Sequence, residues 1–350
     1  MTNRNEIIQA FDVSDISEAY PGPVYITDLK DELGTKGHVL VVRGDKAYED
    51  SLGDNSHLAN PKFWLYENLI NSPRVQEQLR ENPNHKLFDG VGYSSLKALD
   101  YHTNQIGREV VVVMAREMYD KLNTSDYPNI EIIRAKGSAE KGYVEMQKEV
   151  LKERNDIIPL HQALNGARSL APIGNSVIRT LEEMCVIPDK AFFVGASGSN
   201  MYGIGTKIRD QFPNCRVALV EPEDKRTVDP DLDLSNPEAV KRYSIKRLKL
   251  DLEGWDGKYD EEFFPLHMKH PNLYLLQNWI KTGDTQIDEV IGVSEKKAKK
   301  IRKYLRGRNQ DYNWTGTTNM ALVPAVNAAK RGENVLVMAY GRNNEPDKLP

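Results

Sequence analysis

The sequence has few cysteines, no long apolar run and no excess of one charge. Its 350 residues include two cysteines, Cys185 and Cys215, which excludes a disulfide scaffold and a cysteine-built zinc cluster. No apolar stretch approaches the roughly 20 residues of a membrane-spanning helix, and the polar start lacks the apolar core of a signal peptide. Lys and Arg number 47 against 51 Asp and Glu, so no global positive field draws nucleic acid or anionic lipid. We therefore expect a cytoplasmic protein without nucleic-acid or membrane partners.

Short apolar runs alternate with longer helical patterns along most of the chain. The runs of Val, Ile, Leu and Phe occupy 38–44, 108–115, 131–137, 190–196, 216–223 and 334–341. The helical patterns occupy 61–70, 94–107, 139–155, 175–184, 203–212 and 320–332. Alternation of this kind, with nearly continuous apolar strands, predicts an α/β fold with mainly parallel sheets covered by helices.

Two stretches depart from this alternation. Residues 224–290 are rich in Asp, Lys and aromatic residues, and we expect an irregular insertion or lid there. Residues 294–308 form a basic amphipathic pattern with Ile301 and Leu305 at helical spacing. A solvated helix face is favoured over a nucleic-acid patch because the chain is acidic overall.

A turn of small residues follows the apolar strand at 190–194 and precedes a helix and a second strand. Its residues are Gly195, Ala196, Ser197, Gly198, Ser199 and Asn200. Such a turn directs backbone N–H groups at an anion, and the next helix adds its positive end, so a phosphate is the expected ligand. No lysine follows as in a Walker A loop, and the turn lacks G-x-G-x-x-G. Glu221 gives weak support for a dinucleotide ribose, and a turn without any ligand is a further alternative.

This stretch resembles the phosphate loop of the fold-type II pyridoxal-phosphate enzymes, the group of cysteine synthase, tryptophan synthase β and threonine synthase. In that family the loop precedes a helix with G-x-G and a strand ending in V-E-P, here 203–205 and 220–222. Residues 89–118 resemble the family's substrate-carboxylate loop, and 313–341 resemble its late Ser-Ser-Gly helix and final strand. The chain is thus identified as a divergent member of the family. The resemblance implies a large lobe of residues 1–74 and 161–350, a small lobe of 75–160, and a site between them.

The resemblance also implies a lysine that forms an imine with pyridoxal 5'-phosphate. Lys62 stands in the family's position, after Asn60 and at the head of an apolar helix. Its neighbours Phe63 and Trp64 are expected to desolvate the amine and lower its pKa. An ordinary surface lysine is the alternative, and Lys46 is the second candidate for the imine.

The remaining site residues follow from the same resemblance. Backbone amides of the loop at the start of the 94–107 helix are expected to bind the substrate carboxylate, and Ser94 replaces the family's asparagine at the cofactor's phenolic oxygen. The loop comprises Gly92, Tyr93, Ser94 and Ser95. Thr317 is placed at the cofactor, and Arg342 is a candidate partner of the pyridine nitrogen. No metal is expected, because the histidines lack ligand spacing, although His57 and His161 are possible acid–base groups.

The function implied is a pyridoxal-phosphate-dependent lyase or transferase. It would catalyse β-elimination or β-replacement on a small amino acid through an aminoacrylate, and the family is usually homodimeric. Two alternatives stay open. The altered lysine and asparagine motifs suit a non-catalytic or regulatory relative, and the small-residue turn suits a dinucleotide-binding α/β protein.

Overall fold

A computed structural model describes residues 24–136, 143–194, 198–224, 226, 228–251, 279 and 285–342. Six strands form one sheet in the order β1 (Ile26–Asp28), β2 (Val39–Val42), β10 (Val335–Met338), β7 (Lys190–Val194), β8 (Arg216–Pro222) and β9 (Glu289–Val293). Four strands form a second sheet in the order β5 (Ile130–Arg134), β4 (Val110–Met114), β3 (Lys86–Val91) and β6 (Ile157–Pro159). Among these described strands every neighbouring pair is parallel except β1 with β2. The α/β fold with mainly parallel sheets is therefore confirmed.

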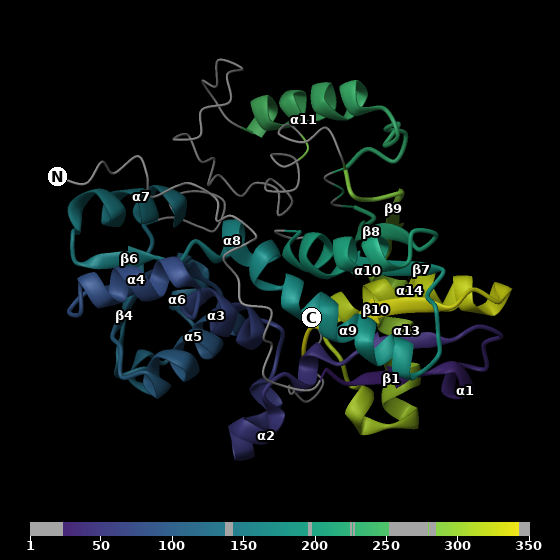
Figure 1. Cartoon of the computed structure of the whole chain (residues 1–350), viewed down its shortest axis with the longest axis horizontal. Coiled ribbons are helices and arrows are strands. Elements are labelled where there is room, and N and C mark those ends of the chain that lie inside the picture. Colours follow the sequence, from purple (N-terminus) through teal and green to yellow (C-terminus); the bar gives the residue numbers. More distant parts are fainter. Residues whose placement is uncertain are drawn as a thin grey trace.

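Helices surround both sheets (Figure 1). In chain order they are α1 (Lys30–Leu33), α2 (Glu49–Leu52), α3 (Lys62–Ile70), α4 (Pro73–Glu81), α5 (Tyr93–Gln105), α6 (Arg116–Tyr119), α7 (Tyr143–Glu153), α8 (Gln162–Ser169), α9 (Ala171–Glu183), α10 (Thr206–Gln211), α11 (Pro237–Asp251), α13 (Glu295–Arg308) and α14 (Gly316–Arg331). Short helical turns are η3 (Gly44–Lys46), η4 (Gly53–Leu58), η5 (Thr124–Asp126), η7 (Gln310–Tyr312) and the π-helical η6 (Met201–Gly205). Helix α3 packs against α5 beside the small sheet and against α8, and α8 in turn packs against η6.

The inner strands, such as β2, β4 and β10, are buried on both faces, which explains their apolar sequences. Within β2, Leu40 and Val42 join one hydrophobic cluster, whereas Val39 and Val41 join another, as the two-residue period of a strand requires. The cluster that holds Leu40 also holds Val110 of the small sheet. A continuous core therefore joins the two sheets.

All six apolar runs read from the sequence contain strands, namely β2, β4, β5, β7, β8 and β10. The expectation of an irregular segment over 224–290 is wrong for two parts of it. Residues Pro237–Asp251 form α11, and Glu289–Val293 form β9, which extends the large sheet beside β8. Val240 and Ser244 face inward on α11 at helical spacing, a pattern that its many charges obscured. Most of the remainder, 252–278, lies outside the described residues.

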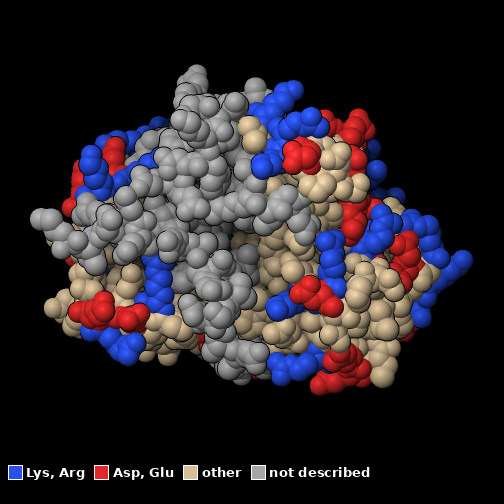
Figure 2. Space-filling model, turned by 45° about the horizontal axis from the view of Figure 1, so that its top comes forward, with Lys and Arg blue, Asp and Glu red and all other residues tan. Residues whose placement is uncertain are grey.

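The surface carries charges of both signs. On the face shown in Figure 2, Lys and Arg side chains are interspersed with Asp and Glu across the described part, in line with the net charge of −4. The basic segment is confirmed as helix α13, with Leu305 buried and Ile301 partly buried against the core. None of the described helices is long and apolar enough to cross a bilayer.

Candidate active site

The candidate site lies at one edge of the large sheet. Strands β2, β10 and β7 are parallel, so their carboxyl ends share an edge, which is the usual place for a ligand in an open α/β sheet. Gly44 follows β2 there, and a Cβ on it would lie 2.5 Å from Pro61 Cγ and 2.6 Å from the Ala339 carbonyl oxygen. This close approach, which only glycine allows, packs the chain just before α3 against the ends of β2 and β10.

Lys62 begins α3 beside this edge. The side chain of Asn60 accepts a hydrogen bond from the backbone N–H of Lys62 at 2.9 Å and fixes the start of the helix. The next two side chains, Phe63 and Trp64, are buried. Burial lowers the pKa of the Lys62 amine to about 8, and Asp89 opposes this shift only in part. The Lys62 ammonium donates a hydrogen bond to Gln162 Oε1, so the amine has a defined direction.

A buried carboxylate lies close to this amine. Asp89, in β3, is 5% exposed and accepts hydrogen bonds from the Tyr66 hydroxyl at 3.0 Å and from the Gln162 backbone N–H at 3.2 Å. Burial raises the pKa of Asp89 to about 7, although these hydrogen bonds and the charge of Lys62 act against the rise. Sequence reasoning missed Asp89, Tyr66 and Gln162. The available signal was an acidic residue inside an apolar strand.

The phosphate turn is described only in part. Gly195, Ala196 and Ser197 lie outside the described residues. Gly198 has φ +77°, a left-handed conformation that favours glycine. Ser199 is buried, and Asn200 Oδ1 is buried without a hydrogen-bond partner, so this acceptor is open to a donor group.

Contacts made one helical turn after Lys62 link α3 and α8 to the phosphate turn. Gly166 follows Gln162 by one turn on α8, and Leu65 follows Lys62 on α3. A Cβ on Gly166 would lie 2.6 Å from Ser199 Oγ and 2.9 Å from Leu65 Cδ1. Helices α3 and α8 therefore meet the end of the phosphate turn, which brings the two principal sequence candidates into one region.

The expected carboxylate loop lies at the amino end of α5. Gly92 is the N-cap residue, and no side chain caps the helix there, so its first backbone N–H groups are open to an anion. Tyr93 and Ser94 are exposed and Ser95 is buried. The Tyr93 hydroxyl donates a hydrogen bond to the Met118 carbonyl at 2.7 Å. The loop begins three residues after Asp89 in the chain.

The late turn places Thr317 and Thr318 differently. Thr317 is exposed in the first turn of α14. Thr318 is fully buried, and its hydroxyl accepts a hydrogen bond from the Tyr340 backbone N–H at 2.9 Å. Thr318 therefore holds the end of β10, while the neighbouring Thr317 is the residue left at the surface.

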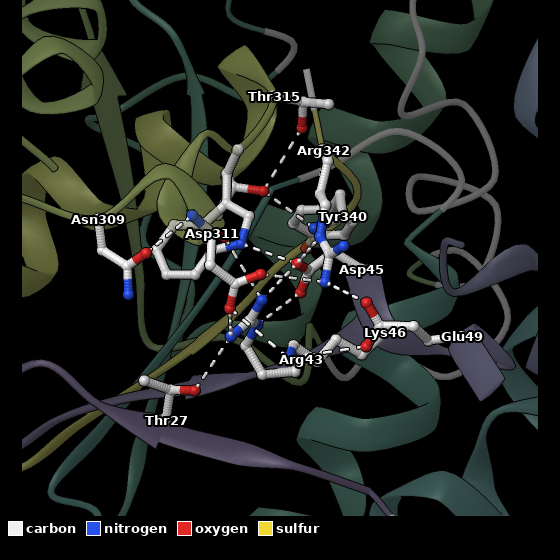
Figure 3. A network of polar contacts seen from close by, with 12 residues as sticks. Thr27, Arg43, Asp45, Lys46, Glu49, Asn309, Asp311, Thr315, Tyr340 and Arg342 are labelled. Atoms are coloured by element: carbon white, nitrogen blue, oxygen red, sulfur yellow. Dashed lines mark hydrogen bonds and ion pairs between the residues drawn. The ribbon is translucent and has the colours of Figure 1, made fainter. Parts of the chain in front are cut away.

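A charged network occupies the ends of β2 and β10 (Figure 3). Asp45 is fully buried and pairs with Arg43 through two bonds of 2.8 Å. It also accepts from Trp314 Nε1 at 3.0 Å and from Arg342 Nε at 3.2 Å. Arg342, the candidate for the pyridine nitrogen, lies 2.7 Å from Glu49 as well. The Arg342 guanidinium is therefore paired with two carboxylates, Asp45 and Glu49, that follow β2 in the chain.

Lys46, the second candidate amine, belongs to the same network. Its Nζ lies 3.6 Å from Glu49 and 3.5 Å from Asp311 (Figure 3). Both ion pairs would have to break before the Lys46 amine could attack an aldehyde. The surroundings of Lys62 suit that chemistry better.

Two histidines and Glu221 were also candidates. His57 is exposed, with Nδ1 3.3 Å from the Asp54 carbonyl oxygen. Burial lowers the pKa of His161 to about 4, so this side chain is neutral near pH 7. Glu221 is buried and accepts a hydrogen bond from the Val228 backbone N–H at 3.1 Å, which occupies the carboxylate expected at a dinucleotide ribose. The described residues contain no His, Cys, Asp and Glu group that could hold a metal.

Comparison with known proteins gives structural matches only. No family model matches the chain, and no curated protein sequence matches it. Among solved structures, O-acetylserine sulfhydrylase isoform 3 from Entamoeba histolytica superposes with a TM-score of 0.64 at 12% identity, covering 98% of this chain and 89% of that one. A hydrogen sulfide-producing enzyme from Fusobacterium nucleatum gives 0.63 at 14% identity, with 96% and 99% covered.

An O-acetylserine-dependent cystathionine β-synthase from Helicobacter pylori also gives a TM-score of 0.63 at 14% identity, covering 100% of this chain and 99% of that one. The superpositions thus extend over nearly the whole of both chains, although few residues are identical. The chain therefore has the fold of the fold-type II pyridoxal-phosphate enzymes, shared with cysteine synthase and cystathionine β-synthase.

Proposed function

We propose that this protein is a pyridoxal-phosphate-dependent enzyme that catalyses β-elimination or β-replacement on a small amino acid, with Lys62 as the residue that bonds to the cofactor. One observation carries the proposal: the half-buried Lys62 at the start of α3 donates a hydrogen bond to Gln162, and its amine has a lowered pKa. The fold adds support, because its structural neighbours are named as O-acetylserine sulfhydrylase, cystathionine β-synthase and a hydrogen sulfide-producing enzyme.

The residues fit pyridoxal 5'-phosphate. The bound cofactor supplies an aldehyde for an amine and an electron sink for charge at the substrate α-carbon. Lys62 provides the amine, and with a pKa of about 8 a useful fraction is neutral near neutral pH. Ser199 and the backbone N–H groups of Gly198 and Asn200 are proposed to hold the phosphate. The remaining turn residues Gly195, Ala196 and Ser197 are proposed for the same role.

The substrate carboxylate is proposed to bind at the amino end of α5. The backbone N–H groups of Tyr93, Ser94 and Ser95 lack a side-chain cap there, and the helix dipole favours an anion at this end. A Cβ placed on Gly92 would have Met118 Sδ as its nearest non-neighbouring atom, at 3.7 Å. The backbone of Gly92 is therefore not crowded. Lys62, on the neighbouring α3, is then the group that takes and returns the proton at the α-carbon.

Further parts of the proposal concern cofactor contacts and assembly. The side chains of Ser94 and Thr317 are exposed on the first turns of α5 and α14, and both are proposed to touch the cofactor.

The small lobe of 75–160 is proposed to bind substrate against the lobe of 1–74 and 161–350. A cytoplasmic homodimer rests on the family resemblance, and light scattering of the purified protein tests its mass.

A spectroscopic experiment tests the proposal. Purified protein is incubated with pyridoxal 5'-phosphate, reduced with borohydride and digested, and the modified peptide is identified by mass. We expect a visible absorbance band before reduction and a phosphopyridoxyl group on Lys62 after it. The Lys62→Ala variant should lose both, whereas Lys46→Ala should retain both. An amino-acid panel assayed for released ammonia or sulfide then identifies the substrate.

Other outcomes of that experiment favour the alternatives. Cofactor bound on Lys62 without turnover of any amino acid would support a non-catalytic relative. A protein that stays colourless and retains a dinucleotide would overturn the proposal. A modified Lys46 would overturn the assignment of Lys62.

A further inference from the structure

We propose that Asp89 is the positioning residue for Lys62, acting through Gln162 to hold the Lys62 amine in one place and to supply its counter-charge. The inference rests on the proposed function for its purpose, but the contacts that carry it do not depend on any cofactor. Asp89 is not proposed to touch the cofactor or the substrate. It acts on the residue that does.

Three hydrogen bonds link four residues from three elements, and the backbone of α3 between Lys62 and Tyr66 closes the loop. Lys62, on α3, donates to the side chain of Gln162 on α8. The backbone N–H of Gln162 donates to Asp89, on β3, at 3.2 Å. Tyr66, one turn after Lys62 on α3, donates to the same carboxylate at 3.0 Å and completes the ring.

The position of Gln162 is set by the backbone on either side of it. The Leu160 N–H donates to the Phe88 carbonyl at 2.8 Å, which continues the pairing of β6 with β3. The Asn165 side chain donates to the Leu160 carbonyl at 2.9 Å. Because His161 has φ +49°, the chain turns sharply before α8 begins. Asp89 therefore binds the first backbone N–H of α8 from a strand that is itself fixed.

A carboxylate here does more than cap the helix. An amide side chain keeps one oxygen for the bonds from Tyr66 and Gln162 and loses the bond that the Gly90 N–H donates to the other oxygen at 2.8 Å. Capping of α8 therefore does not require a charge. Asp89 and Tyr66 are buried, and water does not screen a charge at this depth as it does at the surface. The charge of Asp89 therefore acts on the ammonium of Lys62 and stabilises its protonated form.

Few other titratable groups face this pair. Lys62 and Tyr66 come from α3, Asp89 comes from β3, and His161 precedes α8. His161 is neutral near pH 7, and the charge that acts on it comes from Arg74. Asp89 is thus the source of the electrostatic effect on Lys62 among the described groups.

The test uses cofactor-free protein and measures the acylation rate of Lys62 against pH, with the labelled peptide quantified by mass. Asp89→Asn keeps an oxygen for Tyr66 and Gln162 but removes the charge. We expect the pH midpoint of Lys62 reactivity to fall by roughly one unit. Gln162→Glu should raise the midpoint, because it places a carboxylate at the contact itself. Glu67→Gln is the matched control, because it removes a half-buried carboxylate from the residue that follows Tyr66 in α3. The Lys62 midpoint should not change in this variant.

An unchanged midpoint in Asp89→Asn, with the protein folded, would overturn the proposal and leave Asp89 as a helix cap. If Asp89→Asn does not fold, Tyr66→Phe replaces it. That variant removes one bond to the ionised carboxylate, so the Lys62 midpoint should fall by less, and no fall would again overturn the proposal. Failure to bind pyridoxal 5'-phosphate would refute the proposed function alone, because the acylation measurement needs no cofactor.

Discussion

Gly166 lies so close to Ser199 that a Cβ on the glycine would stand 2.6 Å from the serine Oγ. The methyl group of Gly166→Ala would therefore displace either α8 or the end of the phosphate turn. We expect the dissociation constant for pyridoxal 5'-phosphate to rise at least about tenfold, a loss of roughly 1.4 kcal/mol. Titration of the visible band measures it.

The control for this variant is Gly307→Ala. Gly307 lies in α13, where a Cβ meets no atom within 4 Å. Alanine is the better helix former by about 1 kcal/mol, so this variant should be more stable and bind cofactor as wild type does. Unchanged cofactor affinity in Gly166→Ala would show that Ser199 is not part of the phosphate site.

Asp45 is the buried centre of the charged network, and removing its charge should unfold the protein readily. In Asp45→Asn, Arg43 and Arg342 lose their shared buried carboxylate and keep the more exposed Asp311 and Glu49 as partners. Breaking a buried ion pair on one side costs about 3–5 kcal/mol, so the urea midpoint should fall strongly. Asp120→Asn, which removes an exposed partner of Arg134, should leave the midpoint unchanged. Similar midpoints for both variants would contradict the structural role of Asp45.

His102 should make the protein less stable in mild acid. Its Nε2 lies 2.8 Å from the Phe63 carbonyl oxygen, and burial lowers its pKa to about 4, against 6.5 in the unfolded chain. Between these values the unfolded chain binds more protons than the folded one, so stability is lost as pH falls from 6.5 toward 4. Urea unfolding at pH 7.5 and pH 5 measures the loss.

The variant His102→Gln should lose less stability between these two pH values than wild type. His161 contributes in the same range, because burial also lowers its pKa to about 4, so a smaller acid loss should persist in the variant. An identical loss in both proteins would mean that His102 is protonated as readily in the fold as in the unfolded chain.

Substitutions of Thr317 and Thr318 should have different effects, one on cofactor binding and the other on the stability of the fold. Thr318→Val leaves the half-buried Tyr340 N–H without its acceptor, at a cost of about 1 kcal/mol, and thermal unfolding measures it. Thr317→Val changes an exposed side chain, so it should unfold as wild type does but bind pyridoxal 5'-phosphate more weakly. Normal cofactor affinity in Thr317→Val would remove this residue from the proposed site.

Local patterns in the sequence predicted much of the fold. Apolar runs such as 108–115 became buried strands because period and composition act within a few residues. The strand β9 was missed because its short apolar run, EVIGV, follows a long polar stretch. Helix α11 was missed because charges outnumber the apolar residues on it.

Some residues of the candidate site could be predicted from local motifs, and others could not. Lys62 and the 195–200 turn were recognised from motifs that are continuous in the chain. Asp89 and Gln162 were not, because they are brought to Lys62 only when β3 and α8 pack beside α3. No local pattern signals a contact between residues so far apart in sequence.

Helix α3 carries both Lys62 and Tyr66, so the amine and the hydroxyl that anchors its counter-charge move as one rigid body. A rotation of α3 about its axis would part Lys62 from Gln162 and Tyr66 from Asp89 at the same moment. The two contacts should therefore form or break together, and a substitution that shifts the buried side of α3 should weaken both of them.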